Sequence, residues 1–244
     1  MHLTDHTDEM RYELAAQLDR RNFVQDKSGV RLVEVVGASF HADEETLFGE
    51  VNRDWCHREL QWYLSQSLNV NDIPEPVPEI WRQVADRDGM INSNYGWCLF
   101  SDDNGSQADH VIEELRANPT SRRAVAIYTR PKMWSDYNYC GRSDFCCTNA
   151  VQYLHRGGEL HAVVQMRSND AVFGYKGDRF WQRYALEAIA SKLDLPAGEI
   201  VWQAGSLHVY ERHFYLVDHW AKTGETHVKK SEYAELYPES EWSK

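Results

Sequence analysis

The chain has 244 residues, 42% of them hydrophobic and 26% charged, which is enough apolar material for a packed core and argues against disorder. Its formal net charge of -12 disfavours binding to nucleic acid polymers, although a local cluster of arginines can still hold a mononucleotide. No apolar run reaches the roughly 18 residues of a membrane span. The polar, acidic start MHLTDHTDEM is unlike a signal peptide, so we expect a cytoplasmic protein.

The cysteines indicate neither a metal site nor a disulfide framework. There are five of them, an odd number, at irregular spacing and without a CxxC pair. We therefore expect reduced thiols and no bound metal. The cysteines are Cys56, Cys98, Cys140, Cys146 and Cys147.

The first half of the chain carries signals for helices, a strand and a loop. Residues 5–21 read as an amphipathic helix, and Arg31–Phe40 reads as a strand. Helix formers with apolar spacing near 3.6 dominate Glu44–Ser67. Three prolines make Asn71–Pro78 a loop, and Glu79–Asp86 follows as a short helix.

The second half alternates between strand and helix signals. A helix is expected at Gln107–Ala117 and a strand at Arg123–Thr129. Two further strands, Ala150–His155 and Leu160–Met166, flank the turn residues of a hairpin. Because regular βαβ alternation is lacking, the order of elements predicts an α+β fold. The remaining signals are a helical face at Trp181, Tyr184, Ala188, Ile189 and Leu193, a strand at Ile200–Tyr210 and a helix at Phe214–Ala221.

Two short motifs carry reactive or cationic groups next to predicted strands. Cys147 precedes a strand and could act as a nucleophile if nearby cations lower its pKa, but a buried structural thiol is the common alternative. Arg122 and Arg123 stand at the start of a predicted strand, where two neighbouring guanidinium groups can bind a phosphate. An exposed, solvated charge pair is the alternative.

Polar groups at three other positions are compatible with a site. Arg167-Ser168-Asn169-Asp170 ends a strand, and this composition suits either a site or an ordinary loop. His208 and Tyr210 alternate on one strand, so both side chains point to the same face and could bind a sugar. Glu59 lies among large apolar residues of a helix, either at its wet edge or held for proton transfer.

Together, these motifs resemble the thymidylate synthase superfamily from about Phe23 onwards. Met166–Gly174 is similar to the family signature QRSxDxxLG, and Cys147 precedes Arg167 at the spacing of the family's nucleophile. The other resembling segments are Glu59–Leu64 (ELxWFL in the family), Ile80-Trp81, Asn94–Trp97, Ser121–Arg123 (SRR) and Gly205–Tyr210 (GDxHxY).

One departure from the synthase pattern concerns the substrate base. Synthases continue the signature to PFN, whose asparagine reads uracil, whereas Asp178 stands at that position here. Cytosine presents an amino group, and its N3 gains a proton as electrons enter the ring. A carboxylate accepts hydrogen bonds from both groups. This feature and the run Cys147-Thr148-Asn149 resemble the bacteriophage deoxycytidylate hydroxymethylases of the superfamily, although Asp178 could instead be a loop carboxylate.

The resemblance implies a transfer of one carbon from 5,10-methylenetetrahydrofolate to carbon 5 of dCMP. Hydration would then give 5-hydroxymethyl-dCMP and tetrahydrofolate, a step of phage nucleotide biosynthesis and DNA modification. It also implies one catalytic domain over residues 1–244, a mixed sheet packed with helices, and a sheet-to-sheet homodimer with shared sites. No metal, membrane or direct nucleic acid partner is expected, and a viral enzyme would work in the host cytoplasm.

The resemblance also assigns the individual residues. Catalysis would fall to Cys147 as nucleophile, Tyr95 in removal of the carbon 5 proton, Glu59 in ordering water, and Asp178 at the base. Phosphate would be bound by Arg167, Ser168, Lys27 (an arginine in synthases) and by Arg122 and Arg123 of the partner subunit. The sugar would be held by His208 and Tyr210, and the folate would contact Ile80, Trp81, Asp170 and Gly174.

Three alternatives remain open. Asp178 speaks against a thymidylate synthase or a hydroxymethylase acting on dUMP. Nothing in the sequence excludes the ribose of CMP. A catalytically idle nucleotide-binding subunit of a precursor-supplying complex is the third alternative, and the presence of Cys147, Glu59, Tyr95 and Arg167 argues against it.

Overall fold

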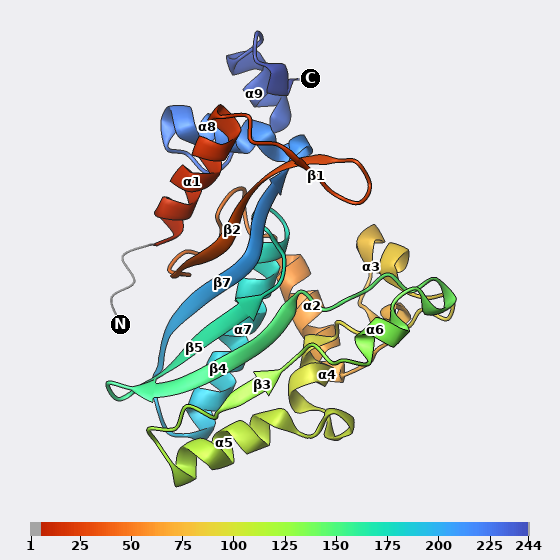
Figure 1. Ribbon diagram of the computed structural model, residues 1–244, viewed down its shortest axis with the longest axis vertical. Helices are drawn as coiled ribbons and strands as arrows, with labels where there is room; N and C mark the ends of the chain where they lie inside the picture. Colours follow the sequence, from red (N-terminus) through yellow and green to blue (C-terminus); the bar gives the residue numbers. More distant parts are fainter. Residues whose placement is uncertain (1–5, 244) are drawn as a thin grey trace. The chain divides into compact units, whose positions relative to one another are not determined.

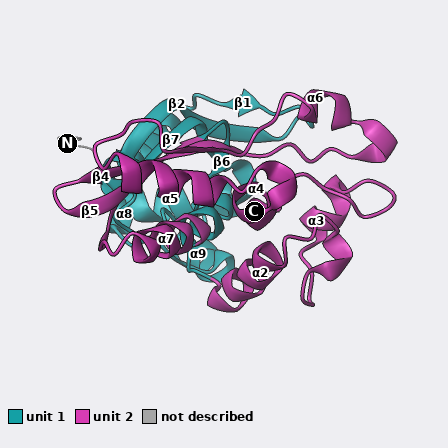
Figure 2. Ribbon diagram, turned by 90° about the horizontal axis from the view of Figure 1, so that it is seen from below, with its two compact units in different colours: residues 1–51, 166–180, 201–244 teal, residues 52–165, 181–200 magenta. Residues whose placement is uncertain are grey.

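The computed structural model describes residues 6–243, which group into two compact units (Figure 2). Of these residues, unit 1 comprises 6–51, 166–180 and 201–243, and unit 2 comprises 52–165 and 181–200. The single catalytic domain over residues 1–244 stays a prediction. In the described part of the chain, no helix is both long and apolar enough to cross a membrane.

Unit 1 is built on a mixed sheet. Strand β2 (Arg31–His41) pairs antiparallel with β1 (Val24–Gln25) and with the part of β7 (Ala197–Tyr210) that belongs to the unit. The two-residue strand β6 (Asn169–Asp170) pairs parallel with β7. Helix α1 (Thr7–Asp19) lies along β2 (Figure 1), and it buries Met10, Leu14 and Leu18 at helical spacing. The C-terminal helices of this unit are α8 (Phe214–Thr223) and α9 (Lys230–Leu236).

Unit 2 combines a three-stranded segment with short helices. Strands β4 (Thr148–Arg156) and β5 (Glu159–Met166) are joined by Gly157-Gly158, both at positive φ, and β3 (Val125–Ile127) pairs antiparallel with β4. The helices are α2 (Arg53–Ser65), α3 (Glu79–Val84), α4 (Tyr95–Phe100), α5 (Gln107–Ala117) and α6 (Met133–Asp136), and α7 (Gly174–Lys192) begins in unit 1 and continues here. Short 3-10 turns occupy Val70–Asp72, Asp102–Asn104, Tyr139–Gly141, Glu211–His213 and Glu241–Ser243.

Most of the predicted elements are confirmed within a few residues. The helix Gln107–Ala117 is found as predicted, and the strand Arg31–Phe40 is extended by one residue. The N-terminal helix is confirmed from Thr7, while its predicted start at residue 5 lies outside the described residues. The α+β class is confirmed, and so is a mixed sheet with helices.

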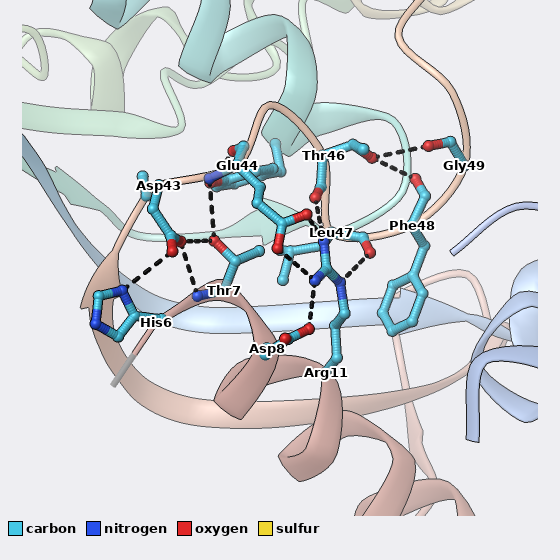
Figure 3. Close-up of polar contacts among 12 residues, drawn as sticks. His6, Thr7, Asp8, Arg11, Asp43, Glu44, Thr46, Leu47, Phe48 and Gly49 are labelled. Atoms are coloured by element: carbon cyan, nitrogen blue, oxygen red, sulfur yellow. Dashed lines mark hydrogen bonds and ion pairs between the residues drawn. The ribbon is translucent and has the colours of Figure 1, made fainter. Parts of the chain in front are cut away.

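The prediction of helix from Glu44 onwards is wrong for residues 44–52, where a buried arginine donates hydrogen bonds to backbone carbonyl groups (Figure 3). Arg11 of α1 is only 2% exposed, and it donates from Nε to the carbonyl of Leu47 at 2.7 Å and from Nη2 to that of Thr46 at 2.8 Å. It also pairs with Glu44 at 2.7 Å. These contacts hold the segment in a non-helical path, and the helix starts only at Arg53, where the side chain of Asn52 accepts the N–H of Trp55 at 3.0 Å.

Gly96 lets helices α2 and α4 approach closely. A Cβ atom built at Gly96 would lie 1.8 Å from the backbone oxygen of Tyr63, a contact that no rotamer change can relieve. The same approach stacks the rings of Tyr63 and Tyr95, whose centroids are 5.4 Å apart. Gly96 thus places the α4 residue next to it, Tyr95, against α2.

We expect Gly96→Ala to destabilise the protein by more than about 3 kcal/mol, because backbone must move to admit the methyl group. Gly158→Ala is the matched control: it has open space but φ +86°, so it should cost only about 1 kcal/mol. Urea unfolding of both variants measures the difference. Equal losses of free energy would contradict a steric role for Gly96.

Candidate active site

Cys147 is the accessible member of a cysteine pair that directly precedes β4. Cys146 is fully buried, with its Sγ 3.5 Å from the carbonyl oxygen of Asn92 and 3.5 Å from Oγ of Ser93. A hydrogen bond with Cys98, followed by burial, raises the pKa of the Cys146 thiol well above its usual value. Cys147 keeps part of its surface exposed. Cys147 is therefore the better placed nucleophile of the two.

Asp144 joins the cysteine segment to the segment that carries Tyr95. Its carboxylate accepts the backbone N–H groups of Asn92 at 2.6 Å and Ser93 at 2.8 Å, and the Ser93 hydroxyl at 2.7 Å. Burial raises the pKa of Asp144. The motif comparison missed this residue, because its role is structural and its partners lie about fifty positions away in the sequence.

A second carboxylate supports the same region. Asp86 accepts the backbone N–H groups of Asp88 at 3.0 Å and Met90 at 2.8 Å and pairs with Arg142 at 2.5 Å. The pKa of Asp86 is lowered because these hydrogen bonds, together with the charge of Arg142, outweigh the effect of its burial. The segment before Cys147 is thus anchored at two places, by Arg142 and by Asp144.

Tyr95 and Glu59 lie on neighbouring helices of unit 2. The backbone N–H of Thr148 donates to the Tyr95 hydroxyl at 3.3 Å, so this hydroxyl lies beside the chain at Cys147. The side chain of Asn94 caps α4 and also donates to the carbonyl of Trp62 in α2 at 2.9 Å. Glu59 of α2 is 8% exposed. The structure therefore brings the predicted nucleophile and Tyr95 together.

The predicted folate residues of unit 2, Ile80 and Trp81, are neighbouring apolar residues of α3. Ile80 is 57% exposed, and the ring of Trp81 meets that of Trp62 edge to face at 5.0 Å. An exposed aliphatic side chain beside an aromatic ring suits the flat pterin of a folate.

The two arginines before β3 differ in their surroundings. Both are exposed, but Arg123 pairs with Glu114 of α5 at 2.9 Å, and Glu114 also accepts the hydroxyl of Ser121. The hydrogen bond from Ser121, followed by Arg123, lowers the pKa of Glu114. The Arg123 guanidinium is thus engaged by Glu114, so Arg122 is the more available of the pair for a phosphate.

Asp178 lies in the first turns of α7, not in a loop, and it contacts β6. The Asn169 side chain donates from Nδ2 to Oδ2 of Asp178 at 2.8 Å. Part of the Asp178 surface is accessible, yet desolvation by the surrounding protein raises its pKa to about 7, with a smaller contribution from the charge of Asp170. An acid with this pKa can both give and take a proton at neutral pH.

The predicted sugar residues lie at the end of β7. The rings of His208 and Tyr210 meet edge to face at 5.0 Å, and Ser206 links them to β2 through a 2.6 Å hydrogen bond from its hydroxyl to Glu34. Burial lowers the pKa of His208, so its ring is neutral at physiological pH. A neutral imidazole suits a hydroxyl partner such as that of a sugar.

The predicted phosphate residues of unit 1 are Arg167, Ser168 and Lys27. Arg167 is exposed, and its carbonyl accepts the N–H of Ser206 at 3.2 Å, while a Cβ at Gly205 would come within 2.9 Å of that carbonyl. Ser168 is partly exposed, and Lys27 lies at the exposed tip of the turn between β1 and β2.

The two predicted folate residues of unit 1 stand around the start of α7. Asp170 accepts the backbone N–H of Val172 at 2.8 Å and lies 3.7 Å from Arg212. A Cβ at Gly174 would lie 3.3 Å from the Asn169 amide. Within unit 1, the structure thus gathers these residues with Asp178 and His208, on β6, on β7 and at the start of α7. Among residues 6–243, no group of three or more His, Cys, Asp or Glu side chains could hold a metal ion.

The chain belongs to the thymidylate synthase family. The family model "Thymidylate synthase" matches residues 18–233. The chain is similar to the deoxycytidylate 5-hydroxymethyltransferases of Enterobacteria phage T4, at 53% identity over 94% of this chain and 96% of the relative, and phage T6, at 54% over 93% and 95%. It is 26% identical to a thymidylate synthase of Francisella philomiragia over 79% of this chain and 76% of that protein. The fold resembles thermostable thymidylate synthase A from Bacillus subtilis, with a TM-score of 0.66 and 22% identity over 87% of this chain and 84% of that one.

Proposed function

We propose that this enzyme is a deoxycytidylate 5-hydroxymethyltransferase, which transfers a one-carbon unit from 5,10-methylenetetrahydrofolate to carbon 5 of dCMP and hydrates it. The products are 5-hydroxymethyl-dCMP and tetrahydrofolate. Support comes from the near full-length similarity to phage enzymes of that name and from the environment of Asp178.

The observation that supports cytosine as the base concerns Asp178. Its carboxyl group has a pKa of about 7 and accepts a hydrogen bond from Asn169. Neutral cytosine offers an amino donor and the N3 acceptor, so a protonated Asp178 donates to N3 and accepts from the amino group. Uracil offers a carbonyl and an N3–H donor in these positions. Because Oδ2 of Asp178 accepts the Asn169 amide, the proton is carried by the other oxygen. The O4 of uracil would then face Oδ2 without a proton between them, which costs affinity.

We assign the covalent step to Cys147. Its thiolate adds to carbon 6 of the base, and Asp178 gives its proton to N3, so the electron pair of the ring double bond becomes available at carbon 5. Arg167 favours the thiolate through its charge. Tyr95, whose hydroxyl lies beside Thr148, helps to remove the carbon 5 proton. When the thiolate leaves, the N3 proton returns to Asp178.

The folate supplies the one-carbon unit, and the apolar side chains of Ile80 and Trp81, with Asp170 and Gly174, would bind it. Glu59 orders the water that becomes the hydroxyl group. Its burial of more than nine-tenths in α2 suits a carboxylate that relays protons. Arg167, Ser168 and Lys27 bind the phosphate, and His208 and Tyr210 bind the 3′-hydroxyl.

We further propose a homodimer in which Arg122 and Arg123 complete the phosphate site of the neighbouring subunit. Strands of both units expose aliphatic side chains: Val36 of β2 is 76% exposed, and Ile127 of β3 is 55% exposed. Exposed aliphatic residues on strands suit packing against a second copy.

Mixing two inactive variants tests the shared site. Cys147→Ser and Arg122→Ala subunits are expected to be nearly inactive alone, since one lacks the nucleophile and the other a phosphate ligand. Subunit exchange should restore activity, because one of the two sites in each mixed dimer receives intact residues from both chains. Failure to recover activity, although mass spectrometry detects mixed dimers, would show that the sites are not shared.

The reaction itself is tested by its products. The enzyme is incubated with 5,10-methylenetetrahydrofolate and each of dCMP, CMP and dUMP, and mass spectrometry measures the nucleotide products. We expect dCMP to gain CH2O and tetrahydrofolate to form. Gain of CH2 by dUMP would indicate a synthase, gain of CH2O by dUMP a deoxyuridylate hydroxymethylase, and equal turnover of CMP would broaden the sugar specificity. Binding without any product would indicate an idle subunit.

A further inference from the structure

Asn169 is a polar residue next to Asp178 to which neither the motif comparison nor the proposed mechanism gives a role. It is 2% exposed and lies on β6, where it pairs with Leu207 of β7 in parallel register. The next strand positions, Asp170 and His208, are paired as well, and the N–H of Ala171 donates to the carbonyl of His208 at 2.8 Å. The backbone of Asn169 is therefore fixed by the sheet.

The two ends of the Asn169 amide have different surroundings. Its Nδ2 donates to Oδ2 of Asp178 at 2.8 Å, whereas its Oδ1 is buried and has no hydrogen-bond partner among residues 6–243. A buried acceptor without a donor costs about 1–3 kcal/mol unless a ligand supplies one. Gly174 lies beside the amide, and a Cβ there would come within 3.3 Å of Nδ2, so a side chain at this position would crowd the hydrogen bond between Asn169 and Asp178.

We infer that Asn169 is a positioning residue that sets the base specificity of the enzyme by fixing Asp178 and by leaving its own carbonyl oxygen for a hydrogen of the cytosine amino group. This inference rests on the proposed function. With Oδ2 held by Asn169, the carboxyl group of Asp178 cannot rotate freely, and its other oxygen is directed to the base. Uracil has no hydrogen on its O4, so it leaves the Asn169 oxygen unsatisfied, which adds to the discrimination.

Asn169 also affects the pKa of Asp178. Its hydrogen bond lowers the pKa of Asp178, while desolvation and the charge of Asp170 raise it. Asp170 is itself faced by Arg212 at 3.7 Å, and its charge acts on His208 and His213. Removing the Asn169 donor therefore moves the pKa of Asp178 upward from about 7. Because the protonated acid pairs with cytosine, binding of dCMP is lost as pH rises through this pKa.

The test is the ratio of dCMP to dUMP affinity between pH 5.5 and 9, measured by calorimetry without folate. Both nucleotides carry the same phosphate, so its titration cancels in the ratio. In the wild type the ratio should fall as pH rises through about 7. Asn169→Leu is nearly isosteric. In this variant, the ratio of dCMP to dUMP affinity should be about tenfold lower than in the wild type at pH 6. The fall of this ratio should occur about one pH unit higher than in the wild type.

Two further variants make the result decisive. Asn169→Asp places a second acid beside Asp178, so the decline should move up further, and it keeps the test open if the leucine variant does not fold. Asn22→Leu changes an exposed asparagine of the same unit and should alter nothing. A merely structural role would weaken both nucleotides equally at every pH and would overturn the inference.

The variant Asp178→Asn separates this inference from the proposed function. If Asp178→Asn leaves the preference for dCMP intact, the proposal that Asp178 recognises the base is wrong. If Asp178→Asn reverses the preference but Asn169→Leu and Asn169→Asp match the wild type, only the role of Asn169 is refuted.

Discussion

Replacing Cys147 with serine is expected to lower turnover of dCMP by at least about a thousand-fold while leaving dCMP binding nearly unchanged. A serine hydroxyl is not ionised at neutral pH, so it cannot add to carbon 6 as the thiolate does. The substitution keeps the shape of the side chain, and the groups proposed to bind phosphate, sugar and base are untouched. Turnover is measured by product formation, and binding by calorimetry without folate.

Cys146→Ser is the matched control, because it makes the same chemical change one residue away. Cys146 is fully buried and its thiol pKa is raised, so it should not act as a nucleophile. A serine there can still contact Ser93 and the carbonyl of Asn92, which the sulfur contacts at 3.5 Å. We expect this variant to keep turnover within about tenfold of the wild type. The reverse pattern, with Cys146→Ser inactive and Cys147→Ser active, would move the nucleophile to Cys146.

Replacing Asp178 with asparagine is expected to change the ratio of kcat/KM for dCMP over dUMP by about a thousand-fold in favour of dUMP. An asparagine amide donates to O4 and accepts from N3–H of uracil, whereas it cannot give N3 of cytosine a proton. The effect should appear in the specificity ratio more than in the affinity for phosphate alone. An unchanged ratio in a folded variant would refute the reading of the base by Asp178.

The same variant should show a pH-dependent gain in stability. The pKa of Asp178 is raised to about 7 in the folded protein from an ordinary value near 4, so folding favours its protonated form. The stability that this group contributes is complete below pH 4 and is lost as pH rises through 7. Asparagine carries no charge to desolvate. The free energy of unfolding of Asp178→Asn should therefore rise relative to the wild type between pH 4 and 8, as urea titrations can measure.

The sequence predicts the long elements well because their patterns reflect burial. Gln107–Ala117 buries four residues of one helical face, and β2 buries Leu32, Val33, Ala38 and Phe40 of the predicted strand. The same patterns fail where a side chain that is distant in the sequence determines the local backbone structure. Arg11 holds the carbonyls of Thr46 and Leu47, and no local pattern in residues 44–52 reveals this partner.

The sequence motifs of the candidate site were predictable, but the residues that hold those motifs in place were not. Cys147, Tyr95 and Asp178 stand in segments with family counterparts, and the Tyr95 hydroxyl is found beside Thr148. Asp144 and Asn169 act through partners that only folding brings near: the backbone of Ser93 for one and the carboxyl group of Asp178 for the other. The strand β6 that fixes Asn169 has two residues, too few to give a periodic signal.

The arginine shown in Figure 3 has a consequence for shortening or redesigning this chain. The family match begins at residue 18, so a version trimmed to the matched stretch would start inside α1 and lack Arg11. The carbonyls of Thr46 and Leu47 would then depend on solvent, and Glu44 would lose its counter-ion. An engineered variant, fusion or circular permutant therefore has to keep this first helix, because Arg11 holds the segment at residues 44–47.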